Sequence, residues 1–202
     1  MDITVKYLGR VEYEPTWRAM QAFSAARDDT TPDELWVLEH PPVFTLGQAG
    51  KREHLLQSSE IPLVPIDRGG QITYHGPGQV VIYVLVDLKR RGYGVKELVS
   101  RMEQAVIELL AQSGVAAERR AGAPGVYVNG AKIAALGLRI KQGRSYHGLA
   151  LNVDMDLAPF ALINPCGYPG MAVTQARTLG IDAGAEELGG RLADILARKI
   201  PA

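Results

Sequence analysis

The chain has 202 residues, enough for one domain that buries roughly 70% of the surface of its unfolded chain without disulfide or metal staples. Its 22 basic and 22 acidic residues balance, so overall charge does not point to a nucleic-acid binder, and any charged partner must meet a local patch. A single cysteine, no signal-peptide pattern and no apolar run of about 20 residues together predict a cytoplasmic protein that does not span a membrane.

Strand patterns dominate the sequence, because alternating or β-branched apolar runs recur between Gly, Pro and Asn breakers. In chain order, the predicted strands are Ile3–Tyr7, Leu35–Glu39, Val43–Leu46, Val80–Val86, Gly125–Val128, Lys132–Ile140 and Ser145–Val153. Asn129-Gly130 is the dipeptide best suited to a type I′ hairpin turn, and a second turn at residues 141–144 precedes the last strand. The last three strands are therefore predicted to form an antiparallel meander.

Apolar residues recur at helical spacing in three places. Pro15 can open an early helix, and Gly114 can end a longer one. The apolar faces of the three helices comprise Trp17, Met20 and Phe23; Val95, Leu98, Met102, Ala105, Val106, Leu109 and Leu110; and Leu188, Leu192, Ile195 and Leu196. Runs of strands with interspersed helices predict an α+β fold, a mixed and mostly antiparallel sheet flanked by helices, as one domain over residues 1–202.

The segment at residues 68–79, RGGQITYHGPGQ, is the densest in polar groups and glycines. Its four glycines let the backbone approach a ligand closely, and Arg68, Thr73 and His75 can supply hydrogen-bonding groups around it. A glycine-rich hairpin with a solvated arginine is the plainer alternative. The spacings of nucleotide-binding loops, G-x-x-x-x-G-K-[ST] and G-x-G-x-x-G, are absent from this segment.

Lys132 enters an apolar strand in the sequence AKIAALG, residues 131–137. Most strand lysines point into solvent. In apolar surroundings, however, desolvation disfavours the ammonium, which would make Lys132 usable as a proton shuttle near neutral pH. In the later segment YHGLALN, Gly148 stands where a strand favours a side chain, which often marks close approach of a ligand or another backbone, whereas His147 alone is more often structural.

Cys166 is the only cysteine, and it lies in the turn-forming sequence NPCGYPG, residues 164–170. A lone thiol cannot form an intramolecular disulfide, so it serves either packing, as an inert small hydrophobe, or reactivity. The flanking Pro and Gly residues favour a loop that presents the thiol, which indicates a nucleophile. If Cys166 is paired with Lys132, the lysine amine could stabilise the Cys166 thiolate or receive the proton of the thiol.

Taken together and in this order, RGGQITYHGPGQ, GAKIAALG, HGLALN and NPCGYPG resemble the lipoyl(octanoyl) transferase family, the octanoyl-[acyl-carrier-protein]:protein N-octanoyltransferases. The resemblance extends from about Leu35 to Cys166 and implies the catalytic-domain fold of biotin and lipoate protein ligases. It also implies two-step acyl transfer: Cys166 takes octanoyl from octanoyl-acyl carrier protein as a thioester, and a lysine of a lipoyl domain then takes it as an amide. Lys132 would act as general base and acid, and neither ATP, a metal nor another cofactor is implied.

The resemblance further implies an acyl pocket. Its expected residues are Arg68, Gly69, Gly70, Gln71, Ile72, Thr73, Tyr74, His75, Ala135, Leu136, Gly137, Gly148, Leu149 and Ala150. Members of the family often have Ser where this chain has Ala135, so only a backbone role carries over at that position.

The partners implied are octanoyl-acyl carrier protein as donor, and lipoyl domains of 2-oxoacid dehydrogenase complexes and the glycine-cleavage carrier protein as acceptors. A monomer is expected, without nucleic acid or membrane partners. Because the carrier is acidic, Lys89, Arg90 and Arg91 are candidate docking residues, with a solvated charge run as the alternative.

Three other functions stay open at this point. An ATP-dependent lipoate or biotin protein ligase would share the fold, but would need a segment that cradles phosphates and no cysteine nucleophile. A non-catalytic module would bind acyl carrier or lipoyl domains without forming an acyl-enzyme. A thiol hydrolase would pair Cys166 with His75 or His147 and use water as acceptor.

Overall fold

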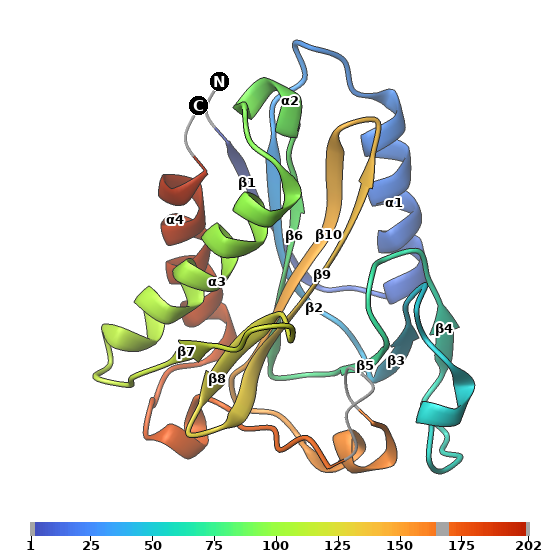
Figure 1. Ribbon diagram of the computed structural model, residues 1–202, viewed down its shortest axis with the longest axis vertical. Coiled ribbons are helices and arrows are strands. Elements are labelled where there is room, and N and C mark those ends of the chain that lie inside the picture. Colours follow the sequence, from blue (N-terminus) through green and yellow to red (C-terminus); the bar gives the residue numbers. More distant parts are fainter. Residues whose placement is uncertain (1–2, 165–169, 201–202) are drawn as a thin grey trace.

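The computed structural model describes residues 3–164 and 170–200, and a seven-stranded mixed sheet forms its centre (Figure 1). The strand order is β1-β2-β6-β10-β9-β8-β7, in which β1 pairs parallel to β2 and every other neighbouring pair is antiparallel. The strands are β1 Thr4–Arg10, β2 Glu34–Glu39, β6 Gln79–Leu85, β7 Glu118–Arg119, β8 Gly125–Val128, β9 Ala131–Lys141 and β10 Arg144–Asn152. The predicted α+β class and the mostly antiparallel sheet are confirmed.

A second, three-stranded sheet lies beside the first at the lower right of Figure 1. Its central strand β3, Val43–Leu46, pairs parallel to β4, Leu63–Pro65, and antiparallel to β5, Ile72–His75. The glycine-rich segment of the sequence thus contributes β5 and leads directly into β6 of the central sheet.

Helices cover both faces of the central sheet (Figure 1). Helix α1, Tyr13–Ala26, lies on one face, and α3, Val95–Ala111, and α4, Ala185–Lys199, lie on the other. All three predicted helices are therefore present, and Pro15 falls in the first turn of α1, where proline is tolerated. Among the described residues, no helix combines the length and the apolar character that crossing a bilayer requires.

The two-sided burial explains why the central strands are apolar at nearly every position. On β2, Leu35 and Val37 belong to the core under α3 and α4, whereas Trp36 and Leu38 pack with Met20 of α1. Successive strand residues point to opposite faces, so a sheet covered on both sides needs apolar residues throughout. Each fully buried aliphatic side chain stabilises the fold by about 1.5–3 kcal/mol.

The predicted meander is also present, as β8, β9 and β10. Asn129 and Gly130 have φ values of 49° and 81°, which fits the two positive φ angles of a type I′ turn. Gln142 and Gly143, with φ values of 54° and 83°, turn β9 into β10 in the same way. This second turn, between β9 and β10, fixes the pairing of Ala135 with Ala150 and of Gly137 with Gly148.

Short elements were not predicted from the sequence, among them β4, β7 and the one-turn helix α2, Leu88–Arg91. Helix α2 is capped by Asp87, whose side chain accepts a hydrogen bond from the Arg90 backbone N–H. These elements are too short for a periodic pattern to identify.

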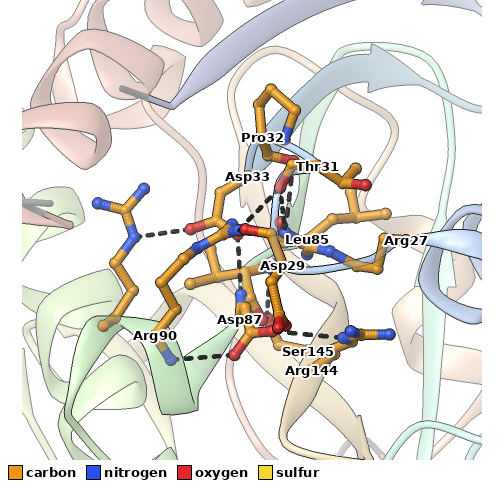
Figure 2. A network of polar contacts seen from close by, with 12 residues as sticks. Arg27, Asp29, Thr31, Pro32, Asp33, Leu85, Asp87, Arg90, Arg144 and Ser145 are labelled. Atoms are coloured by element: carbon orange, nitrogen blue, oxygen red, sulfur yellow. Dashed lines mark hydrogen bonds and ion pairs between the residues drawn. The ribbon is translucent and has the colours of Figure 1, made fainter. Parts of the chain in front are cut away.

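The three basic residues of α2 have different environments, and Figure 2 shows Arg90 in the polar network around Asp33. The Arg90 and Arg91 side chains each contact the fully buried carboxylate of Asp33 at 2.6 Å, and Arg27 pairs with the same carboxylate. The Arg91 side chain is only 2% exposed. Because Arg91 is buried, its interpretation as a docking residue or as part of a solvated charge run is wrong. It helps instead to compensate the charge of a buried carboxylate. Lys89 is exposed.

Candidate active site

Three segments far apart in the sequence meet around one narrow cavity of about 60 Å³. The cavity is lined by Tyr13, Arg68, Gly70, Gln71, Ile72, Thr73, His75, Val81, Tyr83, Ala135, Leu136, Gly137, His147, Gly148, Leu149 and Ala150. Of the residues predicted to form the acyl pocket, all but Gly69 and Tyr74 line it. A wider groove of about 780 Å³, between β1, β2 and the start of α4, contains none of the sequence motifs. The narrow cavity is therefore the candidate site.

Sheet register and one tie between segments bring these residues together. The β9–β10 ladder places Ala135 opposite Ala150 and Gly137 opposite Gly148. The glycine-rich segment is attached to β9, because the Gly69 N–H donates to the carbonyl of Leu138 at 2.9 Å. Gly69 is thus a structural link, and Tyr74 packs away from the cavity, in an apolar cluster with Phe44 and Phe160.

Two glycines at the cavity are required by close neighbours. A Cβ at Gly148 would lie 1.9 Å from the Ile82 carbonyl oxygen, so this glycine permits close approach of another backbone, one of the two options that the sequence left open. A Cβ at Gly137 would lie 3.0 Å from Cδ of Arg68. Gly137 therefore leaves space for the arginine side chain.

Arg68 is buried at the cavity wall and bound by neutral oxygens. Its Nη2 donates to the Thr45 carbonyl at 2.8 Å and to the Thr45 hydroxyl at 2.9 Å, and its Nη1 donates to the Gly69 carbonyl at 2.9 Å. The alternative of a solvated arginine is therefore wrong. A guanidinium held in this way supplies a fixed positive charge beside the cavity.

His75 belongs to a buried amide network that sequence analysis did not identify. Asn152 Nδ2 donates to the Thr174 carbonyl at 3.0 Å, and its oxygen accepts from Gln79 Nε2 at 3.0 Å. Gln79 Nε2 also donates to the Tyr74 carbonyl, so its oxygen faces His75 Nδ1 at 2.7 Å. Because an amide oxygen only accepts, Nδ1 of His75 carries the proton.

Burial, together with the positive charges of neighbouring groups, lowers the pKa of His75 to about 3. The imidazole is consequently neutral near pH 7, and its Nδ1–H already donates to the Gln79 oxygen. A group with so low a pKa is a poor general base at neutral pH.

Asp67 is a second centre that the sequence did not reveal, and it holds His147. Its carboxylate accepts hydrogen bonds from Trp17 Nε1 at 2.9 Å, Gln21 Nε2 at 3.1 Å, the Tyr146 hydroxyl and His147 Nε2 at 2.8 Å. Burial by itself would raise the pKa of Asp67, but these four donors outweigh it and hold the pKa far below its usual value.

His147 reaches Asp67 through an unusual backbone conformation. Tyr146 and His147 are adjacent on β10, and neighbouring strand residues normally point to opposite faces, yet both contact Asp67. The φ of His147 is 61°, in the left-handed region that few residues other than glycine adopt. Burial lowers the pKa of His147 despite the nearby carboxylate, and its Nε2 donates to Asp67, which makes Asp67 its structural partner.

Two tyrosines and His40 complete the aromatic wall near His75. The Tyr13 ring stacks on His75 with centroids 5.9 Å apart, and His40 contacts both rings. His40 Nδ1 donates to the Val11 carbonyl at 2.7 Å, so its Nε2 accepts from the Tyr83 hydroxyl at 2.6 Å. Burial lowers the pKa of His40 to about 4. Tyr13, His40 and Tyr83 lie outside the four sequence motifs. Only the packing of distant elements brings them together.

Lys132 is buried, with 4% of its surface exposed, although most strand lysines face solvent. Its Nζ donates to the Pro124 carbonyl at 3.2 Å and lies 5.2 Å from the centre of the Tyr127 ring. The structure therefore confirms that Lys132 is buried.

The backbone of Lys132 is bonded to the segment that follows residue 170. Its N–H donates to the Ala172 carbonyl at 2.8 Å, and its carbonyl accepts from the Thr174 N–H at 2.9 Å. On the other side, Asn152 binds the Thr174 carbonyl and accepts from Ala176. Residues 172–176 thus lie between the ends of β9 and β10, whose ladder stops at Leu151 and Ala134.

Cys166, the predicted nucleophile, lies outside the described residues. The described residue nearest before it is Asn164, whose N–H donates to the His54 carbonyl at 2.9 Å. Metal binding has no support in residues 3–164 and 170–200, which contain no group of three or more His, Cys, Asp or Glu residues arranged to hold an ion.

Comparison with known proteins identifies close relatives. Residues 12–195 match the family described as the lipoyl protein ligase A/B catalytic domain. The chain is 73% identical to an octanoyltransferase of Thiobacillus denitrificans over 199 residues, which are 98% of this chain and 91% of that protein. It is 64% identical to an octanoyltransferase of Aromatoleum aromaticum over 199 residues, 98% of this chain and 86% of that protein.

Solved structures share the fold at much lower identity. Lipoate-protein ligase A bound with ATP matches with a TM-score of 0.77 and 16% identity, over 98% of this chain and 85% of that one. A biotin protein ligase from Aquifex aeolicus, in complex with biotin and ATP, matches with a TM-score of 0.61 and 11% identity, over 98% and 70% of the two chains. These matches confirm the fold that the sequence motifs implied.

Proposed function

Because this chain belongs to the octanoyltransferase family, we propose that it transfers an octanoyl group from octanoyl-acyl carrier protein to a lysine of lipoyl domains. This acylation would be the first step of endogenous protein lipoylation. The acceptors would be the lipoyl domains of 2-oxoacid dehydrogenase complexes and the glycine-cleavage carrier protein. The reaction needs no cofactor, because a thioester is already activated relative to an amide.

In the first step, the Cys166 thiolate attacks the thioester carbonyl carbon of the donor. A carbon–sulfur bond to Cys166 forms, and the bond to the carrier's sulfur breaks. Lys132 takes the proton of the Cys166 thiol and returns it to the departing carrier thiolate, so the step is balanced in protons.

In the second step, the amine of the acceptor lysine attacks the octanoyl-Cys166 thioester. An amide bond forms, and the Cys166 sulfur leaves as thiolate. Lys132 receives the proton that the attacking nitrogen loses and passes it to the Cys166 thiolate, which restores the starting state.

The observation that carries the proposed Cys166–Lys132 pair is the hydrogen bonding of Lys132 to Ala172 and Thr174. Ala172 follows Cys166 by six residues, a chain of roughly 20 Å at full extension. Lys132 itself is buried on the strand that also carries the cavity residues Ala135, Leu136 and Gly137.

The cavity has the properties that an acyl chain requires. Ile72, Val81, Leu136 and Leu149 supply apolar surface to its lining, which supports binding of an acyl chain there. The histidines are unfavourable bases, because the pKa of His75 and that of His147 are both lowered. This supports Lys132 as the proton carrier and disfavours a hydrolase that uses a Cys–His pair.

One specific observation favours a second candidate, an ATP-dependent ligase: the fold matches that of a ligase bound with ATP at a TM-score of 0.77. The third candidate function is that of a non-catalytic module that binds acyl carrier or lipoyl domains. Incubation of the protein with a lipoyl domain, octanoate and ATP would produce octanoylated acceptor only if the chain is a ligase.

Intact mass after mixing with octanoyl-acyl carrier protein tests the proposal. We expect one octanoyl adduct on the wild-type chain, lost when lipoyl domain is added, and no adduct on Cys166→Ala, which has no other thiol to acylate. Turnover by Cys166→Ala at the wild-type rate would contradict the mechanism. Carrier binding with no adduct on the wild type would identify a binding module.

A further inference from the structure

One peptide group connects the buried carboxylate of Glu103 to Lys132. The Gly125 N–H donates to Glu103 Oε1 at 3.0 Å, and the Pro124 carbonyl accepts from Lys132 Nζ at 3.2 Å. This N–H and this C=O belong to the same peptide unit, and no cis peptide occurs among the described residues. In a trans peptide the two groups point in opposite directions, so the carboxylate and the ammonium bind its opposite ends.

Glu103 is placed for this contact by α3. It lies on the buried face of the helix, between Met102 and Ala105, and is 7% exposed. A carboxylate buried to this extent must be compensated by hydrogen bonds or charge. Its other oxygen, Oε2, accepts from Arg119 Nε at 3.1 Å, and the Arg119 side chain is 40% exposed.

Gly125 lets the connection form without a side chain in the way. A Cβ at this position would lie 2.8 Å from the Ala134 carbonyl oxygen and 2.9 Å from Lys132 Cε. Its φ of 144° also falls in the region that favours glycine. The lysine stem therefore packs directly against the peptide whose carbonyl binds its amine.

We propose that Glu103 is a positioning residue for Lys132, acting through the Pro124–Gly125 peptide. The carboxylate holds this peptide in place and polarises it, so that the Pro124 oxygen is more negative where it meets the lysine. The peptide then fixes the direction of Nζ. This inference rests on the proposed function, since it assigns to Lys132 the acid–base role.

Groups from several elements determine the charge around the amine. Glu103 contributes from α3, Arg119 on β7 partly offsets it from the far side, and the Tyr127 ring on β8 lies 5.2 Å from Nζ. Replacement of Glu103 by Gln keeps the shape and a possible acceptor for Gly125 while removing the charge. Glu103→Ala removes both.

The test measures transfer between octanoyl-acyl carrier protein and a lipoyl domain across pH, for wild type, Glu103→Gln, Glu103→Ala and Lys132→Ala. The matched control is Glu97→Gln, the same change at an exposed position of the same helix. We expect Glu103→Gln to lower kcat about tenfold, less than the roughly 10²-fold or greater loss for the acid–base group itself. KM for the carrier should not change.

The pH profile separates positioning from a merely structural role. With the carboxylate charge gone, the falling alkaline limb of kcat should move to lower pH by about 0.5–1 unit, as a charge acting over several ångströms predicts. Glu97→Gln should leave both rate and profile as in the wild type. Thermal unfolding of each variant establishes that it is folded.

Two results would overturn the inference. One is a Glu103→Gln profile of wild-type height and shape, and the other is a loss that lies wholly in KM or in unfolding with the profile unshifted. Wild-type transfer by Lys132→Ala would instead overturn the acid–base role in the proposed function. An inactive Lys132→Ala beside an unaffected Glu103→Gln rejects the inference alone.

Discussion

At the scale of single residues, the three described histidines of the site have ring nitrogens held by fixed partners. His40, His75 and His147 are buried, their pKa values are lowered, and each has an acceptor or donor that uses its ring nitrogens. Lys132 is also buried, and its amine donates to the Pro124 carbonyl and lies over the Tyr127 ring. The residue chemistry therefore disfavours these histidines as bases, which supports the proposed role of Lys132.

Substitution of Lys132 tests this assignment. Lys132→Ala should lower the transfer rate by roughly 10²-fold or more, on the scale of general acid–base groups. Lys132→Arg should be similarly inactive, because a guanidinium keeps its charge but cannot give up its proton. Transfer rates across pH would check both variants.

The matched control is Lys141→Ala, an exposed lysine on the same strand, which should transfer at the wild-type rate. Alkylation of the single cysteine gives a second measurement, since a fixed cation should still support slow reaction of the thiol in Lys132→Arg. Near-wild-type transfer by Lys132→Arg would reduce the lysine to an electrostatic neighbour.

At the scale of elements, β10 organises the site. Its neighbours β9 and β6 bring the alanine and glycine positions of the cavity together, and its Tyr146 and His147 bind Asp67. The close approach of β6 depends on one position, because a side chain at Gly148 would overlap the Ile82 carbonyl. The register of the motifs thus depends on a backbone contact and not only on side-chain packing.

Gly148→Ala should therefore destabilise the protein by roughly 1–3 kcal/mol or more, the cost of forcing atoms into a filled space. The free energy of unfolding, from denaturant titration, measures the effect. Gly69→Ala is the matched control, since its Cβ would meet only the Leu138 oxygen, at an ordinary 3.5 Å. A Gly148→Ala variant as stable as Gly69→Ala would show that β6 can move aside.

At the scale of the whole molecule, Asp33 joins elements that are distant in the sequence (Figure 2). Arg27 follows α1, Arg90 and Arg91 belong to α2, and all three contact the one carboxylate, which also accepts the Asp87 N–H after β6. Burial opposes ionisation of Asp33, but the hydrogen bonds from Asp87, Arg27 and Arg91 prevail and lower its pKa. Ionised Asp33 therefore contributes to stability.

The sign of this contribution fixes its pH range. Because the pKa of Asp33 is lower in the folded chain than the ordinary value of about 3.9, its stabilisation is present above that value and is lost as pH falls toward the folded pKa. Asp33→Asn should show a shallower decline of unfolding free energy below about pH 4 than the wild type. At pH 7 it should be destabilised by about 3–5 kcal/mol, because buried arginines lose their counterion.

Chemical denaturation at a series of pH values would measure both effects. Asp182→Asn serves as the control, because this carboxylate is 89% exposed and its pair with Arg177 should contribute about 0–1 kcal/mol. An Asp33→Asn variant with wild-type stability at pH 7 would contradict the role of the network.

The sequence by itself determined the elements and the motifs. Alternation and helical spacing are local properties, so the long strands, the three helices and both hairpin turns could be predicted, and the cavity segments carried enough glycine and polar residues to be recognised. The candidate roles of Cys166 and Lys132 came from the motifs as well, through the family they resemble.

Only the tertiary structure decided which groups face one another. Glu103, Asp67 and Asn152 carry no local signal, because each gains its role from a partner more than 20 residues away in the chain. The burial of Arg68, Arg91 and other charged residues likewise depends on their partners, which a window of neighbouring residues does not contain. Local patterns report how the backbone folds, whereas contacts between distant residues depend on how the folded elements pack.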